Sequence, residues 1–145
     1  MRLPISEIMD QTALRNLMEN AKRHKRDDIW QQAFRRLCEL EGQNQSDPLD
    51  RDFYATLRAY EELLTRKNGR TTRANRTRQK LRNKGVIQCL EDWAVSSAPT
   101  EGFNLLVESG MPELTGEFLV IKYADRFSQD AVAAAKTRLG PITTL

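Results

Sequence analysis

The sequence has few of the residues on which secreted, membrane-spanning and metal-dependent proteins rely. It holds two cysteines, Cys38 and Cys89, and one histidine. Both cysteines lie in stretches of helical, apolar pattern, so we expect buried thiols and no disulfide. No apolar run approaches the roughly 20 residues that span a bilayer, and no signal-peptide pattern opens the chain. These absences favour a cytoplasmic, bacterial-type protein.

Residue patterns typical of catalysis are also missing. His24 stands among basic residues at the end of a predicted helix, where a cation suits the helix macrodipole. One histidine and two distant cysteines give no standard zinc spacing, and no glycine-rich phosphate loop is present. Asp47, Asp50 and Asp52 cluster where a helix should start, as capping residues do. We therefore expect no enzyme, no metal site and no cofactor, with a nuclease as the enzyme most worth testing.

Acidic residues are absent from one long stretch, Arg66 to Lys84, which carries nine basic residues. The rest of the chain has 14 basic and 20 acidic residues, although the net charge of the whole is only +3. The positive charge is therefore concentrated in one segment, which we call the basic segment. Such a concentration favours a polyanionic partner.

Apolar residues recur at helical spacing through most of the 145 residues. After an N-terminal arm over residues 1–10, the pattern predicts a single α-helical domain over 11–145, an all-α bundle of six to eight short helices. Predicted helices begin at Thr12, Asp27, Asp47-Pro48, Thr71 or Thr72, Val86 and Ser128. Asp27 and Ser128 are expected as N-caps, and Pro48 as a first helical residue. The second of these helices should end at Gly42 in a left-handed conformation, and the one from Thr71 or Thr72 should end at Gly85.

The run from Glu117 to Tyr123 fits two structures. A short apolar stretch rich in β-branched residues forms a strand as readily as a buried helix. We favour the helix. Seven aromatic residues at helical spacing among apolar residues are expected in the core: Trp30, Phe34, Phe53, Tyr60, Trp93, Phe103 and Phe118.

The predicted helix in the basic segment has little apolar surface with which to pack, only a narrow stripe of Ala74 and Leu81. Its like charges repel one another, and the phosphates of a nucleic acid would offset that repulsion through counterion release. We expect phosphate contacts from the cations on one face and from two in the preceding turn. These are Arg73, Arg76, Lys80 and Lys84, with Lys67 and Arg70.

Amide side chains run along the same helix at Asn75, Gln79 and Asn83, beside Arg76. Amides can bind adenine, and arginine can bind guanine, in the major groove. We expect Asn75, Gln79 and Arg76 to contact bases, and we expect duplex DNA as the partner in preference to RNA. The break at Asn68-Gly69 before this helix resembles, in outline, a helix-turn-helix unit.

Several alternatives stay open at this stage. The basic segment fits an acidic protein, which would make the chain a helical adaptor, or an acidic stretch of the chain itself. The chain also fits an accessory domain whose enzymatic partner lies on another polypeptide. Tyr54 and Tyr123 lie off the apolar stripes, where they would be free to stack on single-stranded bases. A dimer would need an apolar helical stripe that is not used in the core of the domain. The candidate for this stripe is Val132, Ala135 and Leu139.

Overall fold

The computed structural model describes residues 3–140, and within this range the chain is entirely helical. It forms seven α-helices and three short 3-10 turns, with no β-strand among the described residues. The predicted all-α class is confirmed. Packing divides the chain into two compact units, unit 1 (Met1–Ala55) and unit 2 (Thr56–Leu145). The predictions of an arm over 1–10 and of one domain over 11–145 stay predictions.

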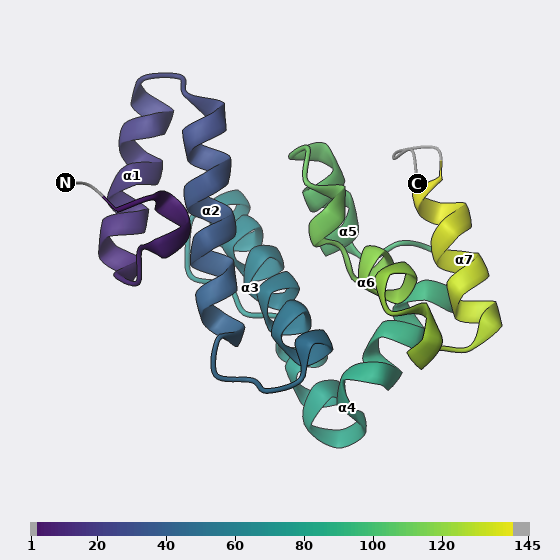
Figure 1. The fold of residues 1–145 in the computed structure, drawn as a ribbon. Coiled ribbons are helices and arrows are strands. Elements are labelled where there is room, and N and C mark those ends of the chain that lie inside the picture. Colours follow the sequence, from purple (N-terminus) through teal and green to yellow (C-terminus); the bar gives the residue numbers. More distant parts are fainter. Residues whose placement is uncertain (1–2, 141–145) are drawn as a thin grey trace. The chain divides into compact units, whose positions relative to one another are not determined.

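Figure 1 labels the helices in chain order. They are α1 (Gln11–Arg23), α2 (Asp27–Gly42), α3 (Pro48–Asn68), α4 (Asn75–Val95), α5 (Glu101–Glu108), α6 (Gly116–Lys122) and α7 (Gln129–Leu139). The 3-10 turns are Ile5–Glu7, Pro112–Leu114 and Ala124–Arg126. Helix α3 starts in unit 1 and ends in unit 2.

Unit 1 is built on the hairpin of α1 and α2 (Figure 1). The largest buried side chains of this unit are Leu14, Met18, Phe34, Leu37, Leu49 and Phe53. The Trp30 ring stacks on Phe34 with 4.9 Å between ring centroids. Arg36 on α2 holds the N-terminal residues, because its Nε donates to the carbonyl oxygen of Ile8 at 2.9 Å. Cys38 is a buried thiol in this unit and takes part in no disulfide, as expected.

Two predicted helix boundaries in unit 1 are wrong in detail. Asp27 is the first residue of α2 and Arg26 is its N-cap, so Asp27 acts through the macrodipole instead of as a cap. Gly42 is the last residue of α2 and lacks the left-handed φ that was predicted for it. Its role is close packing, because a Cβ there would lie 2.4 Å from the carbonyl oxygen of Arg51.

Unit 2 packs α4 against α6 and α7, with α6 against α7 as well. Its buried apolar residues include Leu57, Leu63, Leu64, Cys89, Leu90, Phe103, Leu106, Met111, Leu119, Val120, Ala131, Ala135 and Leu139. Two glycines allow helices to meet aromatic rings. A Cβ on Gly102 would lie 2.6 Å from the ring of Tyr60, and one on Gly116 would lie 2.5 Å from Trp93.

The structure decides several sequence expectations in unit 2. Residues 116–122 form helix α6, so the preference for a helix in the ambiguous run is confirmed. Ser128 caps α7 as predicted, with its Oγ accepting from the backbone N–H of Ala131 at 3.2 Å. The proposed dimer stripe is wrong, because Ala135 and Leu139 are fully buried against their own unit. Of the seven aromatic residues expected in the core, three are buried (Phe34, Phe53 and Phe103) and four are half-buried (Trp30, Tyr60, Trp93 and Phe118).

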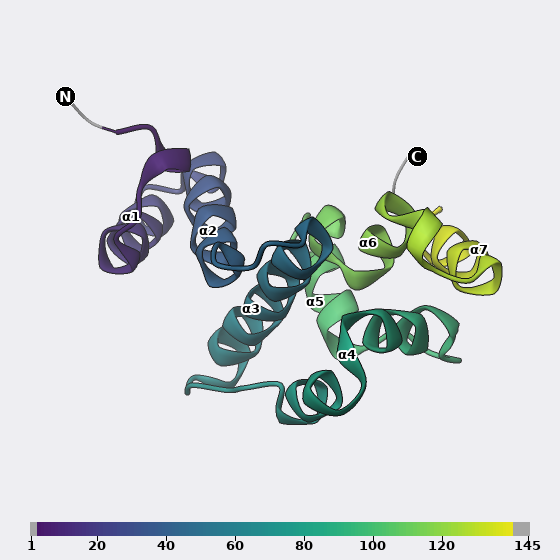
Figure 2. The ribbon, with the colours of Figure 1, turned by 60° about the horizontal axis from the view of Figure 1, so that its bottom comes forward.

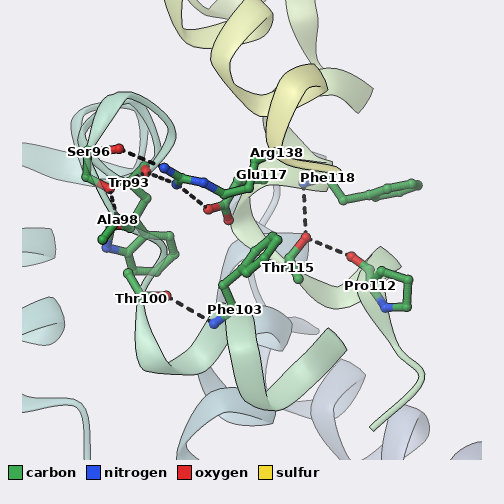
Figure 3. A network of polar contacts seen from close by, with 10 residues as sticks. All are labelled: Trp93, Ser96, Ala98, Thr100, Phe103, Pro112, Thr115, Glu117, Phe118 and Arg138. Atoms are coloured by element: carbon green, nitrogen blue, oxygen red, sulfur yellow. Dashed lines mark hydrogen bonds and ion pairs between the residues drawn. The ribbon is translucent and has the colours of Figure 1, made fainter. Parts of the chain in front are cut away.

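A half-buried arginine joins the ends of three helices in unit 2 (Figure 3). Arg138 on α7 donates from Nη1 to Oε2 of Glu117 on α6 at 3.0 Å. The same guanidinium donates to the backbone carbonyls of Trp93, at 2.8 Å, and Ser96, at 2.7 Å. Burial raises the pKa of Glu117, and the bond to Arg138 only partly opposes that rise. Arg138 thereby satisfies carbonyls at the C-terminus of α4, which have no partner within the helix.

Candidate nucleic-acid interface

The basic segment takes three forms in the structure: the last turn of α3, an irregular connection over residues 69–74, and the first half of α4. Figure 2 shows the connection running from the end of α3 to the first turn of α4. The prediction that Thr71 or Thr72 starts this helix is wrong. The hydroxyl of Thr72 donates to the carbonyl of Arg70 at 2.9 Å, and the helix begins only at Asn75. Arg73 therefore precedes the helix and does not share its face.

Glu61, on α3, fixes where the basic half of α4 begins; this half, residues 75–84, is called the basic helix. Its carboxylate accepts from the backbone N–H of Ala74, the N-cap of α4, at 2.8 Å. It also accepts two bonds from Arg78, from Nε at 2.7 Å and from Nη2 at 2.6 Å. Glu61 is only 6% exposed, so this bidentate pair lies largely out of water. The contacts hold the inner face of the basic helix against α3.

The pKa of Glu61 reflects two opposing effects. Burial by itself raises it, whereas the bonds from Arg78 and from the Ala74 backbone lower it, and the net pKa lies below the ordinary value. Glu61 is therefore a carboxylate at neutral pH. Arg78, one of the nine cations of the basic segment, is paired with this carboxylate and so has no role in binding an external anion.

A kink at Gly85 separates the basic half of α4 from its apolar half. Gly85 has φ 86° and ψ 174°, a backbone conformation that only glycine adopts readily. Beyond the kink, Cys89, Leu90 and Ala94 are buried. The predicted end of the basic helix at Gly85 is therefore confirmed as a break in helical geometry.

Two of the predicted phosphate contacts are paired with acidic residues of the chain itself. Lys67 Nζ lies 2.7 Å from Oε1 of Glu101, and this hydrogen bond raises the pKa of Lys67. Lys80 forms an ion pair with Asp92 across the kink, and its hydrogen bond lowers the pKa of Asp92. The alternative in which an acidic stretch of the chain receives these cations thus applies to part of the basic segment.

The remaining predicted residues are exposed: Arg70, Arg73, Asn75, Arg76, Gln79 and Lys84. Within residues 3–140, the side chains of Arg70, Arg73, Arg76 and Lys84 form no ion pair. These four cations face solvent, and an anion can reach them without first breaking an internal bond.

The outer face of the basic helix is a stripe of amides between two arginines. At about 100° per residue, all the exposed side chains of this helix except Lys84 fall within an arc of about 120°. They are, in order around the helix, Arg82, Asn75, Gln79, Asn83 and Arg76. The first of these, Arg82, is absent from the predicted set. Its position seven residues after Asn75 is the sequence signal that could have identified it.

Other residues considered from the sequence lie elsewhere. Tyr54, in unit 1, is half-buried and packs edge-on against Phe53, with 6.2 Å between the ring centroids. Tyr123 is the C-cap of α6, and Lys122 Nζ lies 5.3 Å from the centroid of the Tyr123 ring. Exposed His24 is the C-cap of α1, the position predicted for it. Neither tyrosine belongs to the basic segment.

The acidic cluster at the start of α3 includes a helix cap. The Asp47 side chain accepts from the backbone N–H of Leu49 at 2.9 Å, and Pro48 is the first helical residue, as predicted. Among residues 3–140 no group of three or more histidine, cysteine or acidic side chains is placed to hold a metal ion. None of the helices formed by these residues combines the length and the apolar character that crossing a membrane requires.

Comparison of the chain with protein-family models, with curated proteins and with solved structures gave no match.

Proposed function

We propose that the protein binds duplex DNA through the outer face of the basic helix at the start of α4. The observation that carries this proposal is the amide stripe flanked by Arg76 and Arg82, on a helix whose inner face is fixed by Glu61. A rigid helix with a polar outer face has the dimensions that the major groove of B-form DNA accepts.

The proposed phosphate contacts come from the cations that face solvent and form no ion pair with described residues. Arg70 and Arg73 precede the helix, while Arg76 and Lys84 lie on it. Each cation that meets a phosphate releases a condensed counterion, and the gains add. Lys80 can join them only by leaving Asp92.

The proposed base contacts come from Asn75 and Gln79, with Arg76 beside them. Amide groups can form two hydrogen bonds with adenine, and a guanidinium group can do the same with guanine. The three side chains are exposed on one stripe, so they can reach the same groove together. In this proposal α3, the connection over residues 69–74 and the basic helix act as a helix-turn-helix-like unit.

The proposed setting is a reducing cytoplasm, which suits two buried thiols that form no disulfide. We propose no catalytic step, metal or cofactor for the DNA contact.

The first experiment measures the affinity of the protein for a mixed-sequence DNA duplex, and for a matched RNA duplex, as a function of salt concentration. We expect tighter binding to DNA and a log-log slope of about −3.6 or steeper, because each of the four proposed phosphate contacts contributes about −0.9. Absence of DNA binding at roughly 50 mM salt, where such contacts are strongest, would contradict the proposal and point to an acidic protein partner.

Two variants test the interface. Arg73→Glu with Arg76→Glu should abolish binding while leaving the helical content unchanged, because both side chains are exposed. The matched control, Lys122→Glu with Lys136→Glu, changes the net charge equally outside the basic segment and should retain binding. Asn75→Ala with Gln79→Ala should flatten sequence preference without changing the salt slope, because amides contact bases and not phosphates. Retained affinity in the first variant would rule out this interface.

A further inference from the structure

A second group of cations lies on unit 1, at the turn between α1 and α2. Residues 22–26 are Lys, Arg, His, Lys and Arg, and all five are exposed. The proposed function leaves this group without a role. Part of it is explained by local physics, because cations in the last turn of α1, such as Lys22 and Arg23, suit the negative end of the helix macrodipole.

Lys25 stands where glycine is the favoured residue. The backbone N–H of Arg26 donates to Ala21 at 2.8 Å, and that of Lys25 donates to Lys22 at 3.2 Å. These two bonds form the Schellman motif that ends many helices, with Lys25 at its left-handed position. Its φ is 56°, and it is the only residue other than glycine with a positive φ in the described part of the chain.

The conformation of Lys25 implies a role for its side chain. A residue with a Cβ is strained in the left-handed region, and glycine is not. Stability alone would therefore favour glycine or asparagine at this turn. The lysine side chain projects into solvent and forms no ion pair with another described residue.

Neighbouring charges leave the turn positive. Arg26 binds Asp28 with 3.0 Å between Nη2 and Oδ2, and Arg23 bonds the side chain of Asn20. Asp27 adds one more negative charge at the start of α2. Lys22 and Lys25 stay exposed and unpaired among the described residues, so they are the two cations most open to an external anion.

We propose that the α1–α2 turn is a second phosphate-binding element, which contacts the backbone of the same DNA that the basic helix binds. This inference rests on the proposed function. Two linked contacts raise affinity beyond either alone, because the second forms within an already bound complex. The turn carries no amide stripe and would add affinity without sequence preference.

The test compares DNA affinity and its salt dependence in the full-length wild type and in Lys22→Gln with Lys25→Gln. Removing two phosphate contacts should make the log-log slope shallower by about 2 and weaken binding more than tenfold at about 0.1 M salt. The control, Lys122→Gln with Lys136→Gln, lowers the net charge equally and should leave both quantities unchanged.

A single substitution separates binding from helix capping. Lys25→Gly removes the strain and the cation together, so it should raise the melting temperature and weaken DNA binding roughly five- to tenfold at about 0.1 M salt. Unchanged DNA affinity with a raised melting temperature would overturn the inference, because Lys25 would then have no part in binding.

The outcomes distinguish the two proposals. A wild type that does not bind DNA overturns both. Loss of binding in Arg73→Glu with Arg76→Glu, but full affinity in Lys22→Gln with Lys25→Gln, overturns only the second element. A shallower slope in both variants, with an unchanged control, supports two elements.

Discussion

At the scale of single residues, Glu61 does the most to organise the proposed interface. One carboxylate caps the start of the basic helix and binds Arg78 through two hydrogen bonds. Hydrogen bonds to charged groups are worth more than neutral ones, and a buried partner left alone carries a desolvation penalty. The acidic residue that most affects the basic helix thus lies on α3, outside the run of like charge.

We expect Glu61→Gln to lower the free energy of unfolding by about 2 kcal/mol at pH 7. Because the folded pKa of Glu61 is lowered, its stabilising effect is complete above the ordinary value of 4.5 and is lost as the pH falls through the folded pKa. The difference between wild type and variant should therefore shrink on acidification. Urea denaturation at several pH values measures it.

The comparison variant is Glu101→Gln, which breaks the exposed pair with Lys67. Water screens an exposed ion pair and its long side chains lose entropy when they are held together, so we expect a much smaller loss. Equal losses in the two variants, or a Glu61→Gln effect that is independent of pH, would contradict the assigned role of Glu61.

At the scale of elements, the kink in α4 sets the direction of the basic helix. Gly85 has φ and ψ values that a residue with a Cβ adopts only under strain. Gly85→Ala should lower the free energy of unfolding by about 2 kcal/mol. Asn83→Ala, at an exposed helical position two residues earlier, should leave stability within about 0.5 kcal/mol. Thermal or urea denaturation checks both, and a neutral Gly85→Ala would show that the kink can straighten without cost.

The elements that the sequence predicts well are those set by neighbouring residues. Asp47 and Ser128 cap helices through bonds to backbone groups two and three residues away, so both caps are visible in the local pattern. The break at Gly85 follows from a glycine after a polar helix. The all-α class follows from apolar periodicity that is repeated along the chain.

The boundaries that the sequence predicts poorly are set by distant residues. The start of the basic helix depends on Glu61, 13 positions before Ala74. The backbone N–H of Thr72 donates to Oγ1 of Thr65, and its hydroxyl donates to the carbonyl of Arg70 instead of capping a helix. Gly42 is held in place by the approach of Arg51. None of these contacts follows a regular spacing that could be recognised in a single sequence.

The sequence predicts only part of the candidate site, because the remaining part also depends on contacts between distant residues. The concentration of cations identifies the segment, but only the tertiary structure shows which cations are already paired. The sequence predicts Lys67 and Lys80 as contacts, but their partners Glu101 and Asp92 lie at the start of α5 and in the second half of α4. The set of contacts predicted from the sequence lacks Arg82, although the spacing of Arg82 places it beside Asn75 on the helix.

At the scale of the whole molecule, each unit has its own core and contains one buried thiol. Cys38 belongs to unit 1 and Cys89 to unit 2. Unit 1 has the smaller set of buried apolar side chains, so it gains less from folding and should open more often. We expect a thiol reagent to label Cys38 before Cys89 under native conditions.

Mass spectrometry of digests taken over time measures the two labelling rates. Burial raises the pKa of the Cys89 thiol in the folded state, so a parallel run in denaturant supplies the intrinsic rate of each thiol. Labelling of Cys89 first, or of both thiols at one rate after that correction, would show that the two units do not open in the expected order.

The contacts between glycines and aromatic rings in unit 2 have an evolutionary consequence. Gly102 lies against Tyr60, and Gly116 lies against Trp93, each too close for a Cβ. A change at either glycine therefore requires a smaller partner, and a smaller partner opens room for a larger residue at the glycine position. In sequences that share this fold, we expect these two pairs to vary together, whereas exposed cations outside the proposed interface interchange freely. Paired substitution at these positions is the mark by which distant relatives of this chain can be recognised.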